Sequence, residues 1–308
     1  MEKTILGVDI GGTSIKIGQF QLDGTLLQKW DIPTNRKNDG AHILEDIVDF
    51  VKQQFSLDSI KGIGFGVPGP VSNDVVSHCV NLGWGRVDVR SRVQELLGRI
   101  DIDIKASNDA NLAAAGEVFQ GAAKGYQNVC MFTLGTGVGG GIIVHGQLVN
   151  GKDGSGGELG HILIDRVHQF SCNCGKKGCL DTIASATGIV NLAKVRLQST
   201  TQPSLLRTFE NFSAKRVFDV AKGGDELAIE VVKEASAYLA QAMAYVTMTL
   251  NPDIFLFGGG VSNAGEYLIE HIKQIYFPLV QPFVFEVPIG LAKLGNDAGI
   301  YGAAYMVK

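Results

Sequence analysis

The chain has 308 residues, of which 45% are hydrophobic and 19% charged, a composition typical of a globular protein with a sizeable core. Its formal net charge is -4 and its isoelectric point is about 5.9, so the composition does not favour nucleic acid as a partner. No apolar stretch approaches the ~20 residues that a membrane-spanning helix needs. We therefore expect a cytoplasmic protein with neither a nucleic-acid nor a membrane partner.

The first predicted elements form a strand, a glycine turn and a second strand. Residues 4–8 form a short apolar run that ends at Asp9, and residues 14–20 alternate after the turn at 11–13. A further hairpin leads to a strand at residues 26–30. The phosphate-binding patterns GxGxxG and GxxxxGKS both require a helix directly after the glycines, so both are excluded.

Polar residues follow the next predicted strands. A helix over residues 42–55 and a buried strand over 60–67 lead to a loop that contains Asn81. A later strand over residues 102–106 is followed by Asn108 and Asp109, one of which can cap the alanine-rich helix that comes next. Because α/β sheets present ligand groups at the carboxyl ends of their strands, these residues are candidates for a binding site.

The initial pattern then repeats. Residues 128–134 predict a strand, residues 135–141 a glycine turn and residues 142–144 a second arm. We interpret this as an internal repeat that gives two similar α/β domains facing each other across a cleft, although two unrelated hairpins are the alternative. The predicted domains are 1–118 and 119–293, with a helix at 294–308 that packs back on the first.

The segment from Gly154 to Asp181 combines polar residues with three cysteines. Cys172, Cys174 and Cys179, with an upstream histidine, make a four-ligand set suited to tetrahedral zinc; incidental thiols in two loops are the alternative. The other two cysteines lie far apart in sequence, so a disulfide framework is not expected.

The remaining sequence is mainly helical. We expect helices over residues 181–197 and 215–250, the second broken at 223–224, and a strand over 253–257 before three consecutive glycines. The last predicted helix, over residues 296–306, has an Asn-Asp pair as its cap.

Several residue types point to phosphoryl transfer. Backbone N–H groups in two glycine turns suit a polyphosphate, and Thr13 and Thr136 add hydroxyl donors. Lys16 adds a positive charge unless it is only solvated, and Asp9 can hold a magnesium-bound water or simply form the turn. Asp109 is the main acid–base candidate, because an attacking alcohol needs a carboxylate beside it; helix capping is the alternative.

Six motifs occur together and in order, and their joint pattern is specific. They are Asp9-x-Gly-Gly-Thr13, Asn81-Leu82-x-Trp84, Asn108-Asp109, Leu134-Gly-Thr-Gly-Val-Gly-Gly-Gly141, Glu158-x-Gly-His161 and Cys172-x-Cys-Gly-x-x-Gly-Cys179. On these residues the chain resembles the ROK family of sugar kinases and repressors over essentially its whole length. The resemblance implies an α/β protein with the actin-like ATPase fold, in which two ribonuclease-H-like domains surround a central cleft and close on a sugar.

The resemblance also implies the ligands and the residues that bind them. It implies ATP with Mg²⁺, a structural Zn²⁺ and a homodimer or higher homo-oligomer. Asp109 is the implied base for the 6-hydroxyl of a hexose. The implied sugar-binding residues are Asn81, Asn108, Asp109, Glu158, His161 and Asp181. The implied ATP and phosphate contacts are Asp9, Gly11, Gly12, Thr13, Lys16, Gly135, Thr136, Gly137, Gly139, Gly258, Gly259 and Gly260. The implied zinc ligands are His161, Cys172, Cys174 and Cys179, with one ring nitrogen of His161 for the metal and one for the sugar.

The implied reaction is the phosphorylation of glucose to glucose 6-phosphate, as in bacterial glucokinases. Kinases for N-acetylmannosamine, N-acetylglucosamine or fructose use the same kind of site and are the alternatives. A ROK repressor is a further alternative, but it carries an N-terminal DNA-binding domain for which the position of Asp9 leaves no room. One residue departs from the family: Asp181 stands where a sugar-binding glutamate is usual, so the sugar preference can differ.

Overall fold

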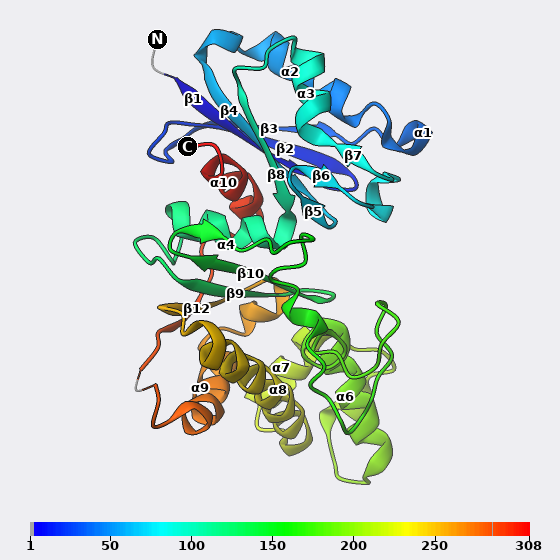
Figure 1. Cartoon of the computed structure of the whole chain (residues 1–308). Coiled ribbons are helices and arrows are strands. Elements are labelled where there is room, and N and C mark those ends of the chain that lie inside the picture. The colour runs from blue at the N-terminus through cyan, green and yellow to red at the C-terminus, as the bar shows by residue number, and fades with distance from the viewer. Residues whose placement is uncertain (1–2, 285) are drawn as a thin grey trace. The chain divides into compact units, whose positions relative to one another are not determined.

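The computed structural model of the protein describes residues 3–284 and 286–308 (Figure 1). The chain divides into two compact units. Unit 1 comprises Met1–Gln127, Gly141–Gly157 and Lys293–Lys308, and unit 2 comprises Asn128–Gly140 and Glu158–Ala292. Both units combine strands with helices, as the predicted fold class requires.

The main sheet of unit 1 has the strand order β3-β2-β1-β4-β8. Its strands are β1 (Thr4–Ile10), β2 (Ser14–Phe20), β3 (Leu26–Pro33), β4 (Ile60–Val67) and β8 (Asp103–Asn108). The first three strands are antiparallel, with Asp9 opposite Lys16, which confirms the predicted hairpin. Strands β4 and β8 run parallel to β1, so all three end at the same edge of the sheet. A small sheet of order β5-β6-β7 comprises β5 (Val71–Ser72), β6 (Val75–Val76) and β7 (Val87–Asp88).

Helices cover both faces of the main sheet (Figure 1). They are α1 (Lys37–Gly40), α2 (Ile43–Gln54), α3 (Val89–Leu97), α4 (Asp109–Gln120) and α10 (Ala298–Tyr305). Helix α2 buries Ile43, Ile47 and Val51 at helical spacing, and α3 buries Val89 and Val93 beside them in one core. Helix α10 packs on the opposite face, against β1 and β4, and also against α4.

Helix α10 approaches its neighbours at backbone distance. A Cβ on Gly64 of β4 would overlap the carbonyl oxygen of Ala303, and a Cβ on Gly302 would overlap that of Leu112 in α4. The Asn-Asp cap predicted for this helix is wrong, because Asp297 makes no capping hydrogen bond. Its carboxylate instead pairs with Lys29 at 2.7 Å, a tertiary contact that the local sequence does not reveal.

The strands of unit 2 lie in the second main sheet, which has buried parallel strands at its centre. The second main sheet has the order β11-β10-β9-β12-β13. Its strands are β9 (Val129–Leu134), β10 (Val138–Val144), β11 (Gln147–Leu148), β12 (Ile254–Gly258) and β13 (Ile289–Leu291). Of these, β11 and the part of β10 from Gly141 onwards belong to the chain segments of unit 1. Strand β12 is buried throughout and pairs with β9 in parallel, from Ile254 opposite Val129 onwards. The predicted glycine turn at 135–141 is too long, because β10 already begins at Val138.

The helices of unit 2 follow the segment that contains the three clustered cysteines. They are α5 (Asp181–Ala184), α6 (Ala186–Ser199), α7 (Ala214–Lys222), α8 (Glu226–Leu250) and α9 (Glu266–Val280). The single helix predicted over residues 181–197 is wrong: Ser185 interrupts it and caps α6 by accepting a hydrogen bond from Gly188 N. The predicted break at 223–224 is confirmed between α7 and α8. None of the helices among the described residues is long and apolar enough to cross a membrane.

Candidate active site and metal cluster

The first glycine turn connects β1 to β2 in unit 1. Gly11 N donates to Ser14 O at 3.0 Å and closes the turn. Thr34 holds the turn from outside: its hydroxyl donates to Gly11 O at 2.7 Å, and its N–H donates to Thr13 O at 3.1 Å. The sequence analysis missed Thr34, because its partners lie more than 20 residues earlier in the chain. The predicted phosphate contacts Gly11, Gly12 and Thr13 thus lie in a turn with a fixed backbone.

Asp9 lies near the end of β1, in a tight and electrostatically unfavourable position. A Cβ on Gly299 would lie 2.5 Å from Asp9 Oδ2, and one on Gly66 would lie 3.3 Å from Oδ1, so both glycines make room for the carboxylate. Burial, followed by the negative charge of Asp109, raises the pKa of Asp9 to about 6, and Lys16 opposes the shift. A cation bound beside Asp9 would offset this negative charge.

Lys16 is bound to the C-terminal segment of unit 1. Its Nζ donates to Asn296 O at 2.6 Å and lies 3.9 Å from Asp297. The ammonium group therefore already has two oxygen partners, and its predicted contact with phosphate stays a prediction.

Asn108 and Asp109 lie side by side at the start of α4, but only Asn108 caps the helix. Asn108 is the N-cap, with Oδ1 accepting from Ala110 N at 2.9 Å and Nδ2 donating to Gly69 O at 3.2 Å. Asp109 is the first residue of the helix, is exposed, and accepts from Ala110 N at 2.8 Å. Because Asn108 supplies the cap, helix capping does not account for a carboxylate at position 109.

Asn81 lies in a rigid loop of unit 1. It is exposed in a 3₁₀ turn over Val80–Leu82, which ends at Gly83 with a φ of 78°. Backbone hydrogen bonds join Cys79 and Trp84 in both directions, at 2.8 and 3.0 Å. The buried indole of Trp84 donates to Gly40 O at 3.0 Å, so this side chain holds the loop that presents Asn81.

The second glycine turn belongs to unit 2. Gly135 N donates to Gly137 O at 2.9 Å, and Val138 N donates to Asp181 Oδ1 at 2.6 Å. Thr136 lies at the centre of the turn, and its carbonyl oxygen accepts from the hydroxyl of Thr187 at 3.0 Å. Gly139, also predicted to contact phosphate, lies within β10 and not in the turn.

A cavity of about 320 Å³ lies beside the third glycine cluster, in unit 2. Gly259 has a φ of 83° and packs on the backbone of Leu134, which fixes the path of the chain into the cavity wall. The lining residues are Ala186, Ser213, Ala214, Lys215, Phe218, Asp219, Lys222, Gly260, Val261, Asn263 and Ala264. The sequence analysis found Gly258, Gly259 and Gly260 but missed the wall supplied by α7, since the amphipathic pattern of α7 marks only its buried face.

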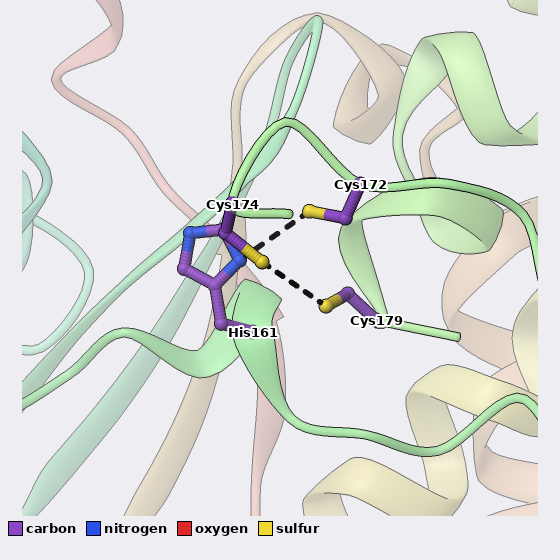
Figure 2. Close-up of side chains that lie close together, drawn as sticks. All are labelled: His161, Cys172, Cys174 and Cys179. Carbon is purple, nitrogen blue, oxygen red and sulfur yellow. Dashed lines mark hydrogen bonds between the residues drawn. The ribbon is translucent and has the colours of Figure 1, made fainter. Parts of the chain in front are cut away.

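The structure brings together the four predicted metal ligands, all in unit 2 (Figure 2). The ligand atoms of His161, Cys172, Cys174 and Cys179 lie within 4.8 Å of one another. Cys172 Sγ lies 3.6 Å from His161 Nδ1, and Cys174 Sγ lies 3.7 Å from Cys179 Sγ. Zinc bonds of about 2.3 Å to sulfur and about 2.1 Å to nitrogen, at tetrahedral angles, separate two sulfurs by about 3.8 Å and sulfur from nitrogen by about 3.6 Å. The two observed distances fit a zinc ion.

His161 presents its two ring nitrogens to different neighbours. Nδ1 faces Cys172, and Nε2 lies 3.9 Å from Glu158 Oε2. Both residues belong to a 3₁₀ turn, whose helical part is Leu159–His161, and both side chains are partly exposed. The predicted division of the imidazole between metal and sugar stays a prediction.

The loop that leads to Cys172 is braced by polar contacts that the sequence analysis did not find. Buried Asp165 accepts hydrogen bonds from the N–H groups of Val167, His168 and Gln169 at 2.8–2.9 Å and from the hydroxyl of Tyr238 at 3.2 Å. These four hydrogen bonds hold the cysteine loop independently of the four predicted metal ligands.

Comparisons with known proteins agree with this geometry. The sequence pattern of the ROK family matches residues 5–308. The chain is 38% identical to a glucokinase of Halalkalibacterium halodurans, with 100% of this chain and 96% of the relative aligned. It is 30% identical to an N-acetyl-D-glucosamine kinase of Haemophilus influenzae, with 97% of each covered. It is similar to the crystal structure of a ROK family glucokinase from Streptomyces griseus in complex with glucose and AMPPNP, with a TM-score of 0.73, 30% identity and 98% of each chain covered.

The α/β units and these structural neighbours define a protein with the actin-like, two-domain fold, as predicted. Within that class the family is established by the match over nearly the whole sequence. The chain belongs to the ROK family.

Proposed function

We propose that the protein is an ATP-dependent hexose kinase that phosphorylates the 6-hydroxyl of glucose. Asp109 carries the proposal: it is an exposed carboxylate at the first position of α4, next to an asparagine that already caps the helix. The similarity to glucokinases over the whole chain supports glucose as the substrate.

In the proposed reaction the sugar hydroxyl attacks the γ-phosphorus of ATP. The new bond forms between the 6-oxygen and phosphorus, the bond from phosphorus to the bridging oxygen breaks, and ADP leaves. Asp109 orients the hydroxyl and accepts its proton as the bond forms. Asn81, Asn108, Glu158 and His161 hold the other hydroxyls, since amide, carboxylate and imidazole groups can match donors and acceptors on a sugar ring.

The nucleotide would bind through backbone groups more than through side chains. The turns at residues 11–13 and 135–137 offer N–H groups and the Thr13 and Thr136 hydroxyls to the phosphates. The 320 Å³ cavity beside Gly260 has apolar walls from Phe218 and Val261, which suit a purine base. Asp9 would hold Mg²⁺ through bound water, and that ion would neutralise charge on the phosphates.

We propose zinc for the cluster of His161 and the three cysteines, in a structural role. Four protein ligands leave no open position for a reacting water, which is the arrangement of structural zinc sites. The ion would fix the turn that carries Glu158 and His161 relative to the cysteine loop. Zinc thiolates of this kind persist in a reducing compartment, so we propose the cytoplasm as the location.

The test is an assay that couples ADP release to a colour change, run with a panel of hexoses at equal concentration. We expect turnover with glucose to exceed turnover with N-acetylglucosamine, N-acetylmannosamine and fructose in kcat/KM. The similarity to an N-acetyl-D-glucosamine kinase makes that sugar the second candidate. Turnover with N-acetylglucosamine but not with glucose would transfer the proposal to the second candidate, and no ADP release with any hexose would refute it.

A further inference from the structure

Asp181, the residue that departs from the family pattern, points into the second glycine turn. Its Oδ1 accepts a hydrogen bond of 2.6 Å from Val138 N, at the first residue of β10. A Cβ on Gly137 would lie only 2.5 Å from the same oxygen, so the carboxylate fills the space directly against the turn. One of its two oxygens is thus committed to the backbone of unit 2.

The residues after Asp181 bind the same turn. Ala186 N donates to Gly135 O at 2.9 Å, and the Thr187 hydroxyl donates to Thr136 O at 3.0 Å. Together with the bond from Val138, these contacts hold the turn at three points along its length. All three come from a stretch of seven residues that starts at Asp181.

The same stretch begins two residues after a predicted metal ligand. Cys179 O accepts from Thr182 N at 3.0 Å and from the Thr182 hydroxyl at 2.7 Å, so Asp181 lies within a hydrogen-bonded turn that starts at the cysteine. On the other side, Gly160 precedes His161 and packs so closely on Val138 that a Cβ there would overlap the Val138 carbonyl oxygen. Val138 is therefore contacted by Asp181, two residues after Cys179, and by Gly160, directly before His161.

We propose that Asp181 is a positioning residue for the phosphate-binding turn, and that the metal cluster sets nucleotide affinity through it. This rests on the proposed function, which assigns the turn at 135–137 to the phosphates of ATP. The resemblance implies a sugar contact for this position, whereas the observed contact of Asp181 is with Val138 N. Asp181 thus supports the nucleotide side of the reaction.

The physical basis is preorganisation. A glycine-rich turn has many accessible backbone conformations. If the turn became ordered only on binding, the entropic cost would weaken the affinity for the nucleotide. A carboxylate that accepts the Val138 N–H fixes the exit of the turn before the nucleotide arrives. The Asp181 carboxylate lies directly against Gly137 and reaches Val138 N, so the length of an aspartate side chain matches the observed contact.

The test measures binding of MgADP and of glucose separately, by calorimetry, on protein with bound zinc. For Asp181→Ala we expect the Kd of MgADP to rise about tenfold, the effect of losing a hydrogen bond to a charged group. The Kd of glucose for Asp181→Ala should stay within about twofold of the wild-type value. The control is Glu270→Ala, which removes an exposed carboxylate of α9; for this variant the Kd values of both MgADP and glucose should stay within about twofold of wild type. In kinetics the KM for ATP should rise while the KM for glucose does not.

Two further arms separate positioning from general loss of structure. Thr187→Val removes one neutral hydrogen bond to the turn and should raise the Kd of MgADP by about threefold. Removal of the metal with a chelator should weaken MgADP binding more in the wild type than in Asp181→Ala, because the coupling passes through that side chain.

The opposite pattern overturns the inference: a tenfold weaker Kd for glucose in Asp181→Ala with unchanged MgADP binding would make Asp181 a sugar ligand. Equal effects of metal removal in both proteins would overturn the coupling through Asp181. If the wild-type protein binds neither MgADP nor any hexose, the proposed function itself fails, which is a distinct result.

Discussion

Replacement of Asp9 by asparagine should make the unliganded protein more stable at neutral pH. The carboxyl has an ordinary pKa of 3.8 and a pKa of about 6 in the folded protein, because burial and the charge of Asp109 disfavour ionisation. Between these values the folded state binds more protons than the unfolded state, so the contribution of Asp9 to stability falls as pH rises. Above pH 6 the folded protein bears the full cost of a buried charge, whereas asparagine bears none.

The size of the effect follows from the shift. About two pKa units correspond to about 3 kcal/mol at pH 8, and the same relation gives about 1.5 kcal/mol at pH 5, where the folded group is mostly protonated. Urea denaturation of wild type and Asp9→Asn at pH 5, 6, 7 and 8 measures the difference directly. Because the other groups are common to both proteins, their titrations cancel.

The same substitution should strongly reduce turnover with glucose and ATP, because a neutral amide is a poorer partner for a magnesium-bound water. Asp9→Asn would then be more stable but nearly inactive. The reasoning is refuted if the stability difference is constant between pH 5 and pH 8, or if the variant is the less stable protein at pH 8.

Three other predictions concern separate parts of the molecule. Asp109→Asn should bind glucose normally but lose about 10²–10⁴-fold in kcat, the usual contribution of a general base. Calorimetry measures the binding and steady-state kinetics the kcat. A near-normal kcat would show that Asp109 is not the general base. Elemental analysis should find about one zinc per chain, and chelation should lower both Tm and glucose affinity, because the ligands also hold the turn of Glu158 and His161. Glu117 is fully buried and accepts hydrogen bonds from the N–H groups of Ala122, Lys293 and Leu294 at 2.6–2.9 Å. Glu117→Gln places an amide donor among these donors and should cost about 3 kcal/mol in urea denaturation, whereas a change below about 0.5 kcal/mol would contradict this account.

Local signals were sufficient for much of the fold. The first hairpin was predicted because alternation and turn residues act over neighbouring positions, and β1 and β2 pair as expected. The cluster of Cys172, Cys174 and Cys179 was predicted because their short spacing restricts which side chains can meet. In both cases the decisive contacts are close in sequence.

The failures have a common physical cause in tertiary contacts. Gly141 was assigned to a turn, yet it lies in β10. A Cβ at this position would lie 2.5 Å from the Cβ of Ala114, so the glycine permits close packing and does not indicate a bend. Asp297 was expected to cap α10, but its carboxylate instead accepts a hydrogen bond from Lys29, which is distant in sequence. The hydrogen bond from Val138 N to Asp181 was not predicted, because Val138 lies 43 residues earlier in the chain.

The close packing of α10 has a consequence for the order in which the molecule acquires its structure. Unit 1 is discontinuous, and α10 contacts β1 and β4 at backbone distance through Gly7 and Gly64. During synthesis these strands are made first, and α10 is made only after all of unit 2. Until then, the face of the N-terminal sheet that α10 covers remains exposed. We therefore expect unit 2 to reach its native fold earlier during synthesis, and unit 1, although begun first, to be completed last.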